Sequence, residues 1–287
     1  MEQQVKPEAI QTLIARLDNE DIEAQHSAAV ELIEIGEAAV DPIISALPGA
    51  EPHARYLMSW VLGEIGDERA IRPLIDRMSD PDSHVQEWAA KALGEIGDEG
   101  AVPVLLAALD ASGTNPSTRR NIAAALGWIG DERAVEPLIN LTQHDDDPVR
   151  GFAAAALGAL GDKRAVKPLL PLLENDDQWV RIRTAKALGE LGDFHATEKL
   201  IVSLTDDREW VRYNVVWALG EIRDGRAYES LIAMLNDDSA NVRRCTIEAL
   251  AQIGDPRATE ALQRLLLTDT DSGVKGAAHI ALQTLGA

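Results

Sequence analysis

The residues of this sequence that could carry out chemistry are scattered along the chain. Its six histidines share no metal-ligand spacing: His26, His53, His84, His144, His195 and His279. The only cysteine, Cys245, has no histidine on its own helix to activate it as a nucleophile. No glycine-rich phosphate loop follows a strand, because the sequence predicts no strands. These patterns predict no catalytic residues, no metal site and no cofactor.

Runs of aspartate are the remaining candidate for a metal site. They recur at 145–147, 176–177, 206–207 and 237–238. A calcium loop needs spaced ligands and a bidentate glutamate, and neither is present. The runs are instead typical of turns that cap the helix that follows, where a carboxylate also complements the helix dipole.

The element that must position all these residues is a repeat. A helix ending in Ala-Leu-Gly-x-Ile-Gly is followed by Asp and then by another helix, which contains Arg-Ala-Val-x-Pro-Leu. This other helix is the first helix of the next repeat, and the helix that ends at the glycine is the second helix of its own repeat. The terminal glycine recurs every 30 to 33 residues, with Arg223 in its place once: Gly36, Gly66, Gly97, Gly130, Gly161, Gly192, Gly254 and Gly286. Such a period is typical of stacked two-helix units that bury their apolar faces against their neighbours.

We therefore expect an all-α fold, a right-handed α-solenoid of nine two-helix repeats that forms a single domain over residues 1–287. The approximate repeats are 5–36, 37–66, 67–97, 98–130, 131–161, 162–192, 193–223, 224–254 and 255–286.

The second helix of each repeat carries the clearest packing pattern. Counting back from the terminal glycine, the residues at −12, −8, −5, −4 and −1 are nearly always apolar and lie on one side of a helix. Position −3 is glycine in six repeats: Gly63, Gly94, Gly127, Gly158, Gly189 and Gly220. Glycine inside a helix costs about 1 kcal/mol relative to alanine, so we expect it to admit a close neighbouring helix.

Position −11 is basic in most repeats: Arg55, Arg119, Arg150, Arg181, Arg212, Arg243 and Lys275. One reading is an anion-binding strip. The interpretation we favour is structural, with each side chain paired to the aspartate that follows a terminal glycine, such as Asp67 or Asp224, or to a helix C-terminus.

The face of the second helix opposite its apolar side is unusually aromatic. It collects nine of the chain's eleven aromatic residues: Tyr56, Trp60, Trp88, Trp128, Phe152, Trp179, Trp210, Tyr213 and Trp217. In a solenoid this face lines the inner curve, and large exposed apolar patches mark contact sites. Together with Arg120 and Arg183, these residues form the partner-binding surface that we predict, with Trp60, Trp88, Tyr213 and Trp217 as apolar anchors. For Trp179 and Trp210 a second reading stays open, in which each covers the loop of the preceding repeat.

The charge balance narrows the class of partner. The chain has 27 Lys and Arg against 48 Asp and Glu, a net charge of −21. This acidity argues against nucleic acid and anionic membranes and favours another protein that presents a basic or apolar segment. The first residues lack a signal-peptide pattern, and no apolar run reaches the ~18 residues of a membrane span. With one cysteine, we expect a cytoplasmic protein.

The repeated block, as in 92–98 and 130–138, resembles the HEAT-like repeat of phycobilisome (PBS) bilin lyases. Two enzyme families share such repeats. Deoxyhypusine hydroxylases hold a di-iron centre with His-Glu pairs, and no histidine here is followed by glutamate. A subunit of a bilin lyase, or another chromophore-handling factor, remains the alternative to a non-enzymatic scaffold or adaptor that grips its partner on the aromatic face. A consensus-engineered repeat protein is a third possibility, and the irregular second, fourth and seventh repeats speak against it.

Overall fold

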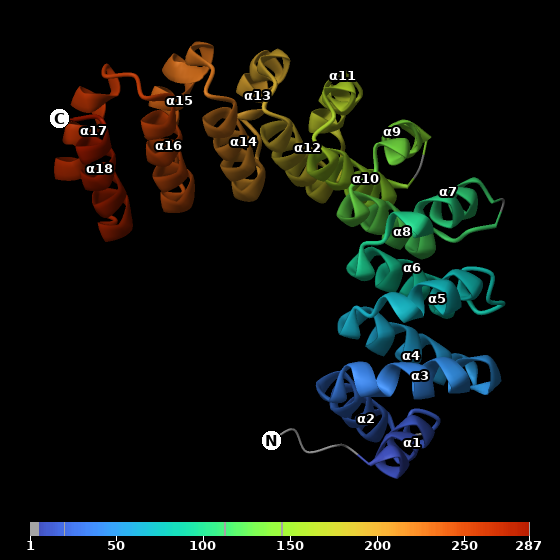
Figure 1. Cartoon of the computed structure of the whole chain (residues 1–287). Coiled ribbons are helices and arrows are strands. Elements are labelled where there is room, and N and C mark those ends of the chain that lie inside the picture. The colour runs from blue at the N-terminus through green and yellow to red at the C-terminus, as the bar shows by residue number, and fades with distance from the viewer. Residues whose placement is uncertain (1–5, 20, 112, 145, 287) are drawn as a thin grey trace. The chain divides into compact units, whose positions relative to one another are not determined.

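The computed structural model describes residues 6–19, 21–111, 113–144 and 146–286, and every regular element in these ranges is helical (Figure 1). The chain divides into two compact units, Met1–Pro137 and Leu138–Ala287. We call them unit 1 and unit 2 and describe each by itself. Helix α9 (Val135–His144) begins in the first and continues into the second. Residue 145, in the first predicted aspartate run, lies outside the described residues.

In unit 1, helices α2, α4, α6 and α8 pack side by side in chain order. The preceding first helices are short and are often entered through a turn of 3₁₀ helix (η). The elements are α1 (Pro7–Arg16), α2 (Ile22–Ile35), α3 (Glu37–Ala46), η1 (Leu47–Gly49), α4 (Pro52–Ile65), η2 (Glu68–Ala70), α5 (Ile71–Arg77), α6 (Ser83–Ile96), η3 (Glu99–Ala101), α7 (Val102–Asp110), α8 (Pro116–Ile129) and η4 (Glu132–Ala134).

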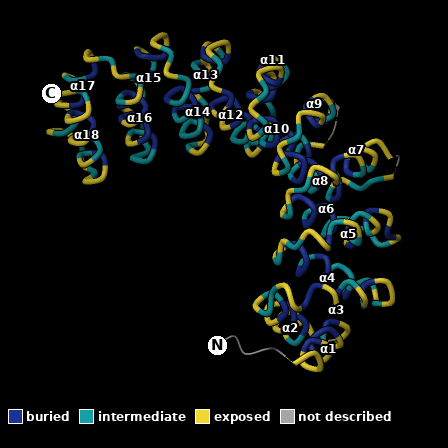
Figure 2. The backbone as a smooth tube through the Cα atoms, viewed as in Figure 1, coloured by how far each residue is buried: buried dark blue, intermediate teal, exposed yellow. Residues whose placement is uncertain are grey.

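In unit 2, helices α10, α12, α14, α16 and α18 pack in the same way, and buried positions recur in every helix pair (Figure 2). The elements are α10 (Asp147–Leu160), η5 (Lys163–Ala165), α11 (Val166–Leu169), η6 (Leu170–Glu174), α12 (Gln178–Leu191), η7 (Phe194–Ala196), α13 (Thr197–Ser203), α14 (Glu209–Ile222), η8 (Gly225–Ala227), α15 (Tyr228–Met234), α16 (Ala240–Ile253), α17 (Ala258–Thr268) and α18 (Ser272–Thr284). The predicted all-α repeat fold is thus confirmed.

The end of each second helix follows from its terminal residue. Gly97 and Gly130 adopt a left-handed conformation with φ of 78° and 80° and end α6 and α8. Arg223 takes the same conformation at φ 55° and is the one described non-glycine residue with positive φ. The aspartate that follows then starts the next 3₁₀ turn, as when Asp131 accepts a hydrogen bond from the N–H of Arg133.

The glycines at position −3 sit where neighbouring second helices come closest. A Cβ placed on Gly94 would lie 2.6 Å from the Cα of Ala125, and one on Gly189 would lie 2.8 Å from the Cα of Ala218. The same close approach holds for Gly63, Gly158 and Gly220. The predicted close approach of helices at these positions is therefore confirmed, because any larger residue would push the helices apart.

The arginines at position −11 bind hairpin aspartates in place of the predicted aspartate after a terminal glycine, whereas the predicted contact with a helix C-terminus is found where Arg181 reaches Asn175, the C-cap of η6. Arg181 binds the carboxylate of Asp206 at 2.7 and 3.0 Å and donates to the carbonyl of Asn175 in its own hairpin turn. Arg212 repeats these bonds with Asp237 and with the carbonyl of Asp206. Each arginine thus joins its own hairpin to the next one. In the same way Arg243 reaches Asp269, and Arg55 reaches Asp80 in unit 1.

The aspartates after the terminal glycines pair instead with the arginine two residues later. Asp67 binds Arg69 and Asp224 binds Arg226, in both cases beside the backbone N–H that the same carboxylate caps. The prediction failed because a near neighbour in the sequence reaches the carboxylate first. Position −11, at the start of the second helix, lies beside the hairpins and not beside these turns.

The predicted capping by aspartate runs holds for Asp177, which accepts from the N–H groups of Trp179 and Val180 at the start of α12. It does not hold in the same form at Asp206, which accepts from the N–H of Arg208 while also holding Arg181. No helix in the described residues combines the length and apolarity that crossing a lipid bilayer requires.

Candidate protein-binding surfaces

In unit 1 the aromatic residues of the second helices stack on one another. The ring of His26 on α2 lies parallel to Trp60 on α4, with centroids 5.6 Å apart, and Trp60 meets Trp88 on α6 at 6.1 Å. The ammonium of Lys91 lies 4.7 Å from the centre of the Trp88 ring, a cation–π contact. We call these four residues the unit 1 aromatic row.

The polar atoms of this row are also engaged. The indole N–H of Trp60 donates to Glu64 at 2.9 Å, and Lys91 pairs with Glu95 at 3.1 Å. Trp60 and Trp88 are both half-buried. Much of the aromatic surface in this row is therefore covered by the protein's own side chains.

The other predicted site residues of unit 1 differ in exposure. Tyr56 and Arg120 are half-buried, whereas Trp128 is 55% exposed. One edge of Trp128 lies over Gly94, where its Cε3 would stand 2.9 Å from an added Cβ. Trp128 thus covers a helix contact and still presents more than half of its surface.

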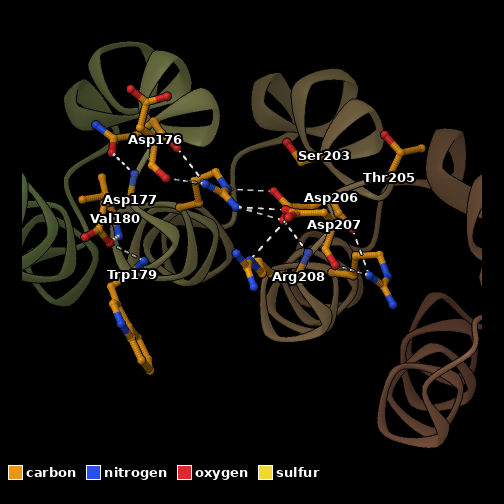
Figure 3. Close-up of polar contacts among 12 residues, drawn as sticks. Asp176, Asp177, Trp179, Val180, Ser203, Thr205, Asp206, Asp207 and Arg208 are labelled. Atoms are coloured by element: carbon orange, nitrogen blue, oxygen red, sulfur yellow. Dashed lines mark hydrogen bonds and ion pairs between the residues drawn. The ribbon is translucent and has the colours of Figure 1, made fainter.

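In unit 2 the two tryptophans at the start of second helices are open to solvent. Trp179 on α12 and Trp210 on α14 are each 55% exposed. Figure 3 shows the Trp179 side chain extending away from the polar contacts around Asp206 and Arg208. Each ring is thus partly covered by the protein and partly open to solvent.

Trp210 is paired with Tyr213, whose ring it meets edge-on at 5.7 Å and 66°. Tyr213 is half-buried, and burial raises the pKa of its hydroxyl. The two rings therefore meet at an angle near the start of α14. We call Trp179, Trp210 and Tyr213 the unit 2 tryptophan surface.

The remaining predicted residues of unit 2 pack against the protein itself. Trp217 lies over Gly189, with its Cζ3 2.7 Å from where a Cβ would stand. The guanidinium of Arg183 covers the ring of Phe152 at 4.4 Å. Trp217, Arg183 and Phe152 are half-buried. Trp217, predicted as an apolar anchor of the binding surface, therefore fills the helix contact at Gly189.

Some exposed apolar residues were not among the predicted site residues. Ile280 is 64% exposed and borders a groove of about 410 Å³ with Ile247 and Ala277. It occupies position −6 in the last repeat, the position of Trp60 and Trp217. An aliphatic residue at that position is the sequence signal that points to it.

The hairpins of α12 and α14 enclose a larger cleft of about 710 Å³, lined by Glu174, Asp176, Val202 and Asp207. The Arg181–Asp206 ion pair crosses it. Other carboxylates that line this cleft also bind the protein's own side chains, as Glu174 binds Lys199.

The residues with catalytic potential remain apart. Cys245 is 2% exposed and its thiol contacts the carbonyl of Tyr213, while burial raises its pKa to about 12. Among the described residues, no three His, Cys, Asp or Glu side chains gather in a way that could hold a metal ion.

Comparison with known proteins places the fold. The family model described as HEAT repeats matches residues 40–114, 135–210 and 197–283, which is more than half of the chain. The chain belongs to the HEAT repeat family. A second model, the PBS lyase HEAT-like repeat, matches residues 118–144.

Similar solved structures support the same fold. An engineered protein shares 23% identity at a TM-score of 0.57, covering 97% of this chain and 89% of its own. The YibA protein of E. coli shares 18% identity at a TM-score of 0.63, covering 92% and 98%. The CpcE–CpcF complex of phycocyanin lyase from Nostoc sp. PCC7120 aligns over 99% and 97% at 21% identity, but its TM-score of 0.40 is too low to carry an argument. No curated protein matches the chain.

Proposed function

We propose that this HEAT repeat protein is a non-enzymatic binding scaffold that holds a segment of another protein against the aromatic faces of its second helices. The observation that carries the proposal is the exposure of three tryptophans, Trp128, Trp179 and Trp210, at 55% each. Tryptophan is the residue type most enriched at the energetic centres of protein interfaces, and exposing it to water has no structural benefit.

The half-buried aromatic residues support these contacts from below. Trp217 and Phe152 hold neighbouring repeats together, so the exposed rings stand on rigid helices. A rigid surface loses little conformational entropy on binding. The net charge of −21 favours partners that are basic or apolar over nucleic acid, and the single cysteine fits a reducing, cytoplasmic setting.

The test is a peptide-display selection on the intact protein. The wild type is compared with a variant in which Trp128, Trp179 and Trp210 are all alanine, and with Phe194→Ala as a control. Phe194 is 58% exposed but lies in η7, off the second helices.

We expect peptides to be enriched by the wild type and by the control and to be lost from the triple variant, with all three proteins retaining their helical circular dichroism. Equal enrichment on all three proteins, or none on any, would contradict the proposed function.

The second candidate is a subunit of a bilin lyase, favoured by the match of residues 118–144 to the PBS lyase HEAT-like repeat. This function predicts a red-shifted visible absorbance when the protein is mixed with a linear tetrapyrrole such as phycocyanobilin. An unchanged tetrapyrrole spectrum at equimolar protein would remove it.

A further inference from the structure

The cleft between the hairpins of α12 and α14 is lined mostly by acidic side chains. Its volume is about 710 Å³, and it lies in unit 2 between the turns that precede two packed helices. The charged residues of its lining are five carboxylates and two arginines, with a net charge of −3: Glu174, Asp176, Asp177, Asp206, Asp207, Arg181 and Arg208. Lys199, which binds Glu174 from outside the lining, reduces the net charge to −2. The cleft therefore stays negative after its own ion pairs are counted.

Exposed carboxylates lie on both walls of this cleft. Asp176 is exposed in the hairpin before α12, and its carboxylate has no hydrogen bond or ion pair with any residue that the structure describes. The side chain of Asp207, in the hairpin before α14, is 74% exposed and lies 3.3 Å from Arg208. Figure 3 shows Asp176 and Asp207 on the two neighbouring hairpins. A ligand between the hairpins therefore meets negative charge from both sides.

Two exposed apolar side chains border the same cleft. Trp179, at the start of α12, is 55% exposed, and Val202, on α13, is 63% exposed. The ring of Trp179 extends away from the polar contacts of the hairpins (Figure 3). Lysine and arginine combine an aliphatic stem, which covers such apolar surface, with a charged end that pairs with carboxylates. Tryptophan is also the aromatic ring that attracts a cation most strongly.

We propose that this cleft binds a cationic segment of the partner protein, with lysine or arginine side chains at the hairpin carboxylates and their aliphatic stems against Trp179 and Val202. This assignment rests on the proposed function and names the chemistry of the segment that the scaffold holds. The net charge of −21 attracts a cationic segment from a distance, and charge complementarity at the cleft fixes where it docks.

Segments of other chemistry fit this cleft less well. An acidic segment needs available cations, but Arg181 is 12% exposed and is already held by Asp206. An apolar segment that filled the cleft would take Asp176 and Asp207 out of water without giving them partners, which costs free energy. A cationic segment supplies those partners.

Arg208 opposes a cationic ligand and therefore provides a test with the opposite sign. Its side chain lines the cleft, is 61% exposed and neutralises part of the charge of Asp207. Arg208→Gln removes this like charge but keeps the backbone N–H that Asp206 accepts. The substitution should therefore strengthen binding, whereas a substitution that merely disturbed the hairpin would weaken it.

The experiment titrates the full chain with short peptides and follows the ¹⁵N-detected indole N–H signal of Trp179, assigned with Trp179→Phe. The probe is acetylated, amidated Gly-Lys-Leu-Lys-Gly. The control peptides Gly-Gln-Leu-Gln-Gly and Gly-Glu-Leu-Glu-Gly replace its lysines with neutral and acidic residues. Each peptide is also titrated at low and at high salt, because exposed ion pairs are screened by salt.

Three variants remove one negative charge each from the same position of consecutive repeats. Asp176, Asp207 and Asp238 all lie sixteen residues before the residue that ends their second helix. All three are exposed, but Asp238 is not among the residues that line the cleft. Asp238→Asn is therefore the matched control for Asp176→Asn and Asp207→Asn.

We expect saturable shifts with the lysine peptide, and about fivefold weaker binding of the glutamine and glutamate peptides. Asp176→Asn and Asp207→Asn should each weaken binding about threefold, as loss of an exposed ion pair does, while Asp238→Asn leaves it unchanged. Arg208→Gln should strengthen it about twofold. Equal weakening by all three Asp→Asn variants would show a response to net charge alone and overturn the assignment. Equal binding of the glutamine peptide, or weaker binding by Arg208→Gln, would overturn it as well.

The display selection separates failure of this assignment from failure of the proposed function. Selected peptides that depend on the exposed tryptophans but are not enriched in lysine or arginine would overturn the cationic segment and leave the scaffold intact. If no selected peptide depends on any of the three exposed tryptophans, both fall.

Discussion

The two units join their second helices in the same way but use their aromatic residues differently. Gly94 in unit 1 and Gly189 in unit 2 both admit an alanine of the next helix at backbone distance. In unit 1 the tryptophans at mid-helix stack with His26 and Lys91. In unit 2 two tryptophans stand at the helix starts with more than half of their surface exposed. Mid-helix positions therefore bury much of an aromatic ring, whereas positions near a helix end leave Trp128, Trp179 and Trp210 more than half exposed.

The hairpin contacts also differ between the units. Unit 2 has three consecutive arginine bridges, from Arg181 through Arg212 to Arg243. In unit 1 Arg55 forms one, and the next repeat has Gln86, which bonds only within its own hairpin. Three consecutive bridges thus cross-link the hairpins at the edge of unit 2 beside its tryptophan surface.

The largest effect on stability is expected for Arg212→Ala. It leaves Asp237, whose side chain is 6% exposed, without its ion pair, and breaking a buried pair costs about 3–5 kcal/mol. The measurement is urea unfolding followed by circular dichroism. Arg257→Ala is the control, because its ion pairs are on the surface and should contribute little to stability. Similar losses in the two variants would show that the bridges do not stabilise unit 2.

A smaller loss is expected for Trp217→Ala, about 2–3 kcal/mol, because the ring fills the contact at Gly189 and is only partly exposed. Trp210→Ala should change unfolding by less than about 1 kcal/mol, since it removes mainly solvated surface. Melting temperatures of the two variants decide the matter. A larger drop for Trp210→Ala would reverse our division between packing and binding residues.

Helix propensity alone predicts that replacing a helical glycine with alanine stabilises a protein. The close helix contacts at the glycines of both units predict the opposite change in stability. Gly94→Ala and Gly189→Ala should each destabilise by about 1–3 kcal/mol through overpacking, in both units alike. Gly276→Ala in α18 is the matched control, because an added Cβ there meets no atom within 4 Å. It should stabilise by up to ~1 kcal/mol. If all three substitutions stabilise, helix approach at position −3 is not limiting.

Acid sensitivity should be common to both units. Hydrogen bonds from Arg69 and from Arg226 lower the pKa values of Asp67 and Asp224 to about 2. A carboxyl whose pKa is lower in the folded state stabilises the fold above its unfolded pKa near 4 and loses that contribution as pH falls toward 2. Melting temperature measured from pH 5 to pH 2 should fall in this window. Asp67→Asn and Asp224→Asn should each flatten the decline, and an unaltered pH profile would contradict the role of these carboxylates.

The smallest effect concerns the accessibility of Cys245 in unit 2. A buried thiol with a pKa of about 12 should react with a disulfide reagent at pH 8 at least tenfold more slowly than a free cysteine. Because it contacts the carbonyl of Tyr213, ligand binding at the tryptophan surface should slow it further. A labelling rate equal to that of free cysteine would show that α14 and α16 separate readily in solution.

The sequence was sufficient for the architecture, since periodic glycines such as Gly97 and Gly130 predict both the helix ends and the spacing of the repeats. It also predicted which glycines lie in helix contacts. It was not sufficient for the partners of Arg212 or for the exposure of Trp217, because both depend on the offset between neighbouring helices. For that reason Trp179 and Trp210, which are more exposed than Trp217, are the stronger candidates for anchors.

The arginine bridges of unit 2 make its repeats interchangeable. Arg181 holds Asp206 in the same way that Arg212 holds Asp237, each partner 25 residues ahead in the chain. Excision of one 31-residue period would place Asp237 where Arg181 now finds Asp206. Genetic gain or loss of a whole repeat can therefore lengthen or shorten this unit without leaving a buried charge unmatched, and each added repeat offers one more second-helix start at which a tryptophan can be selected.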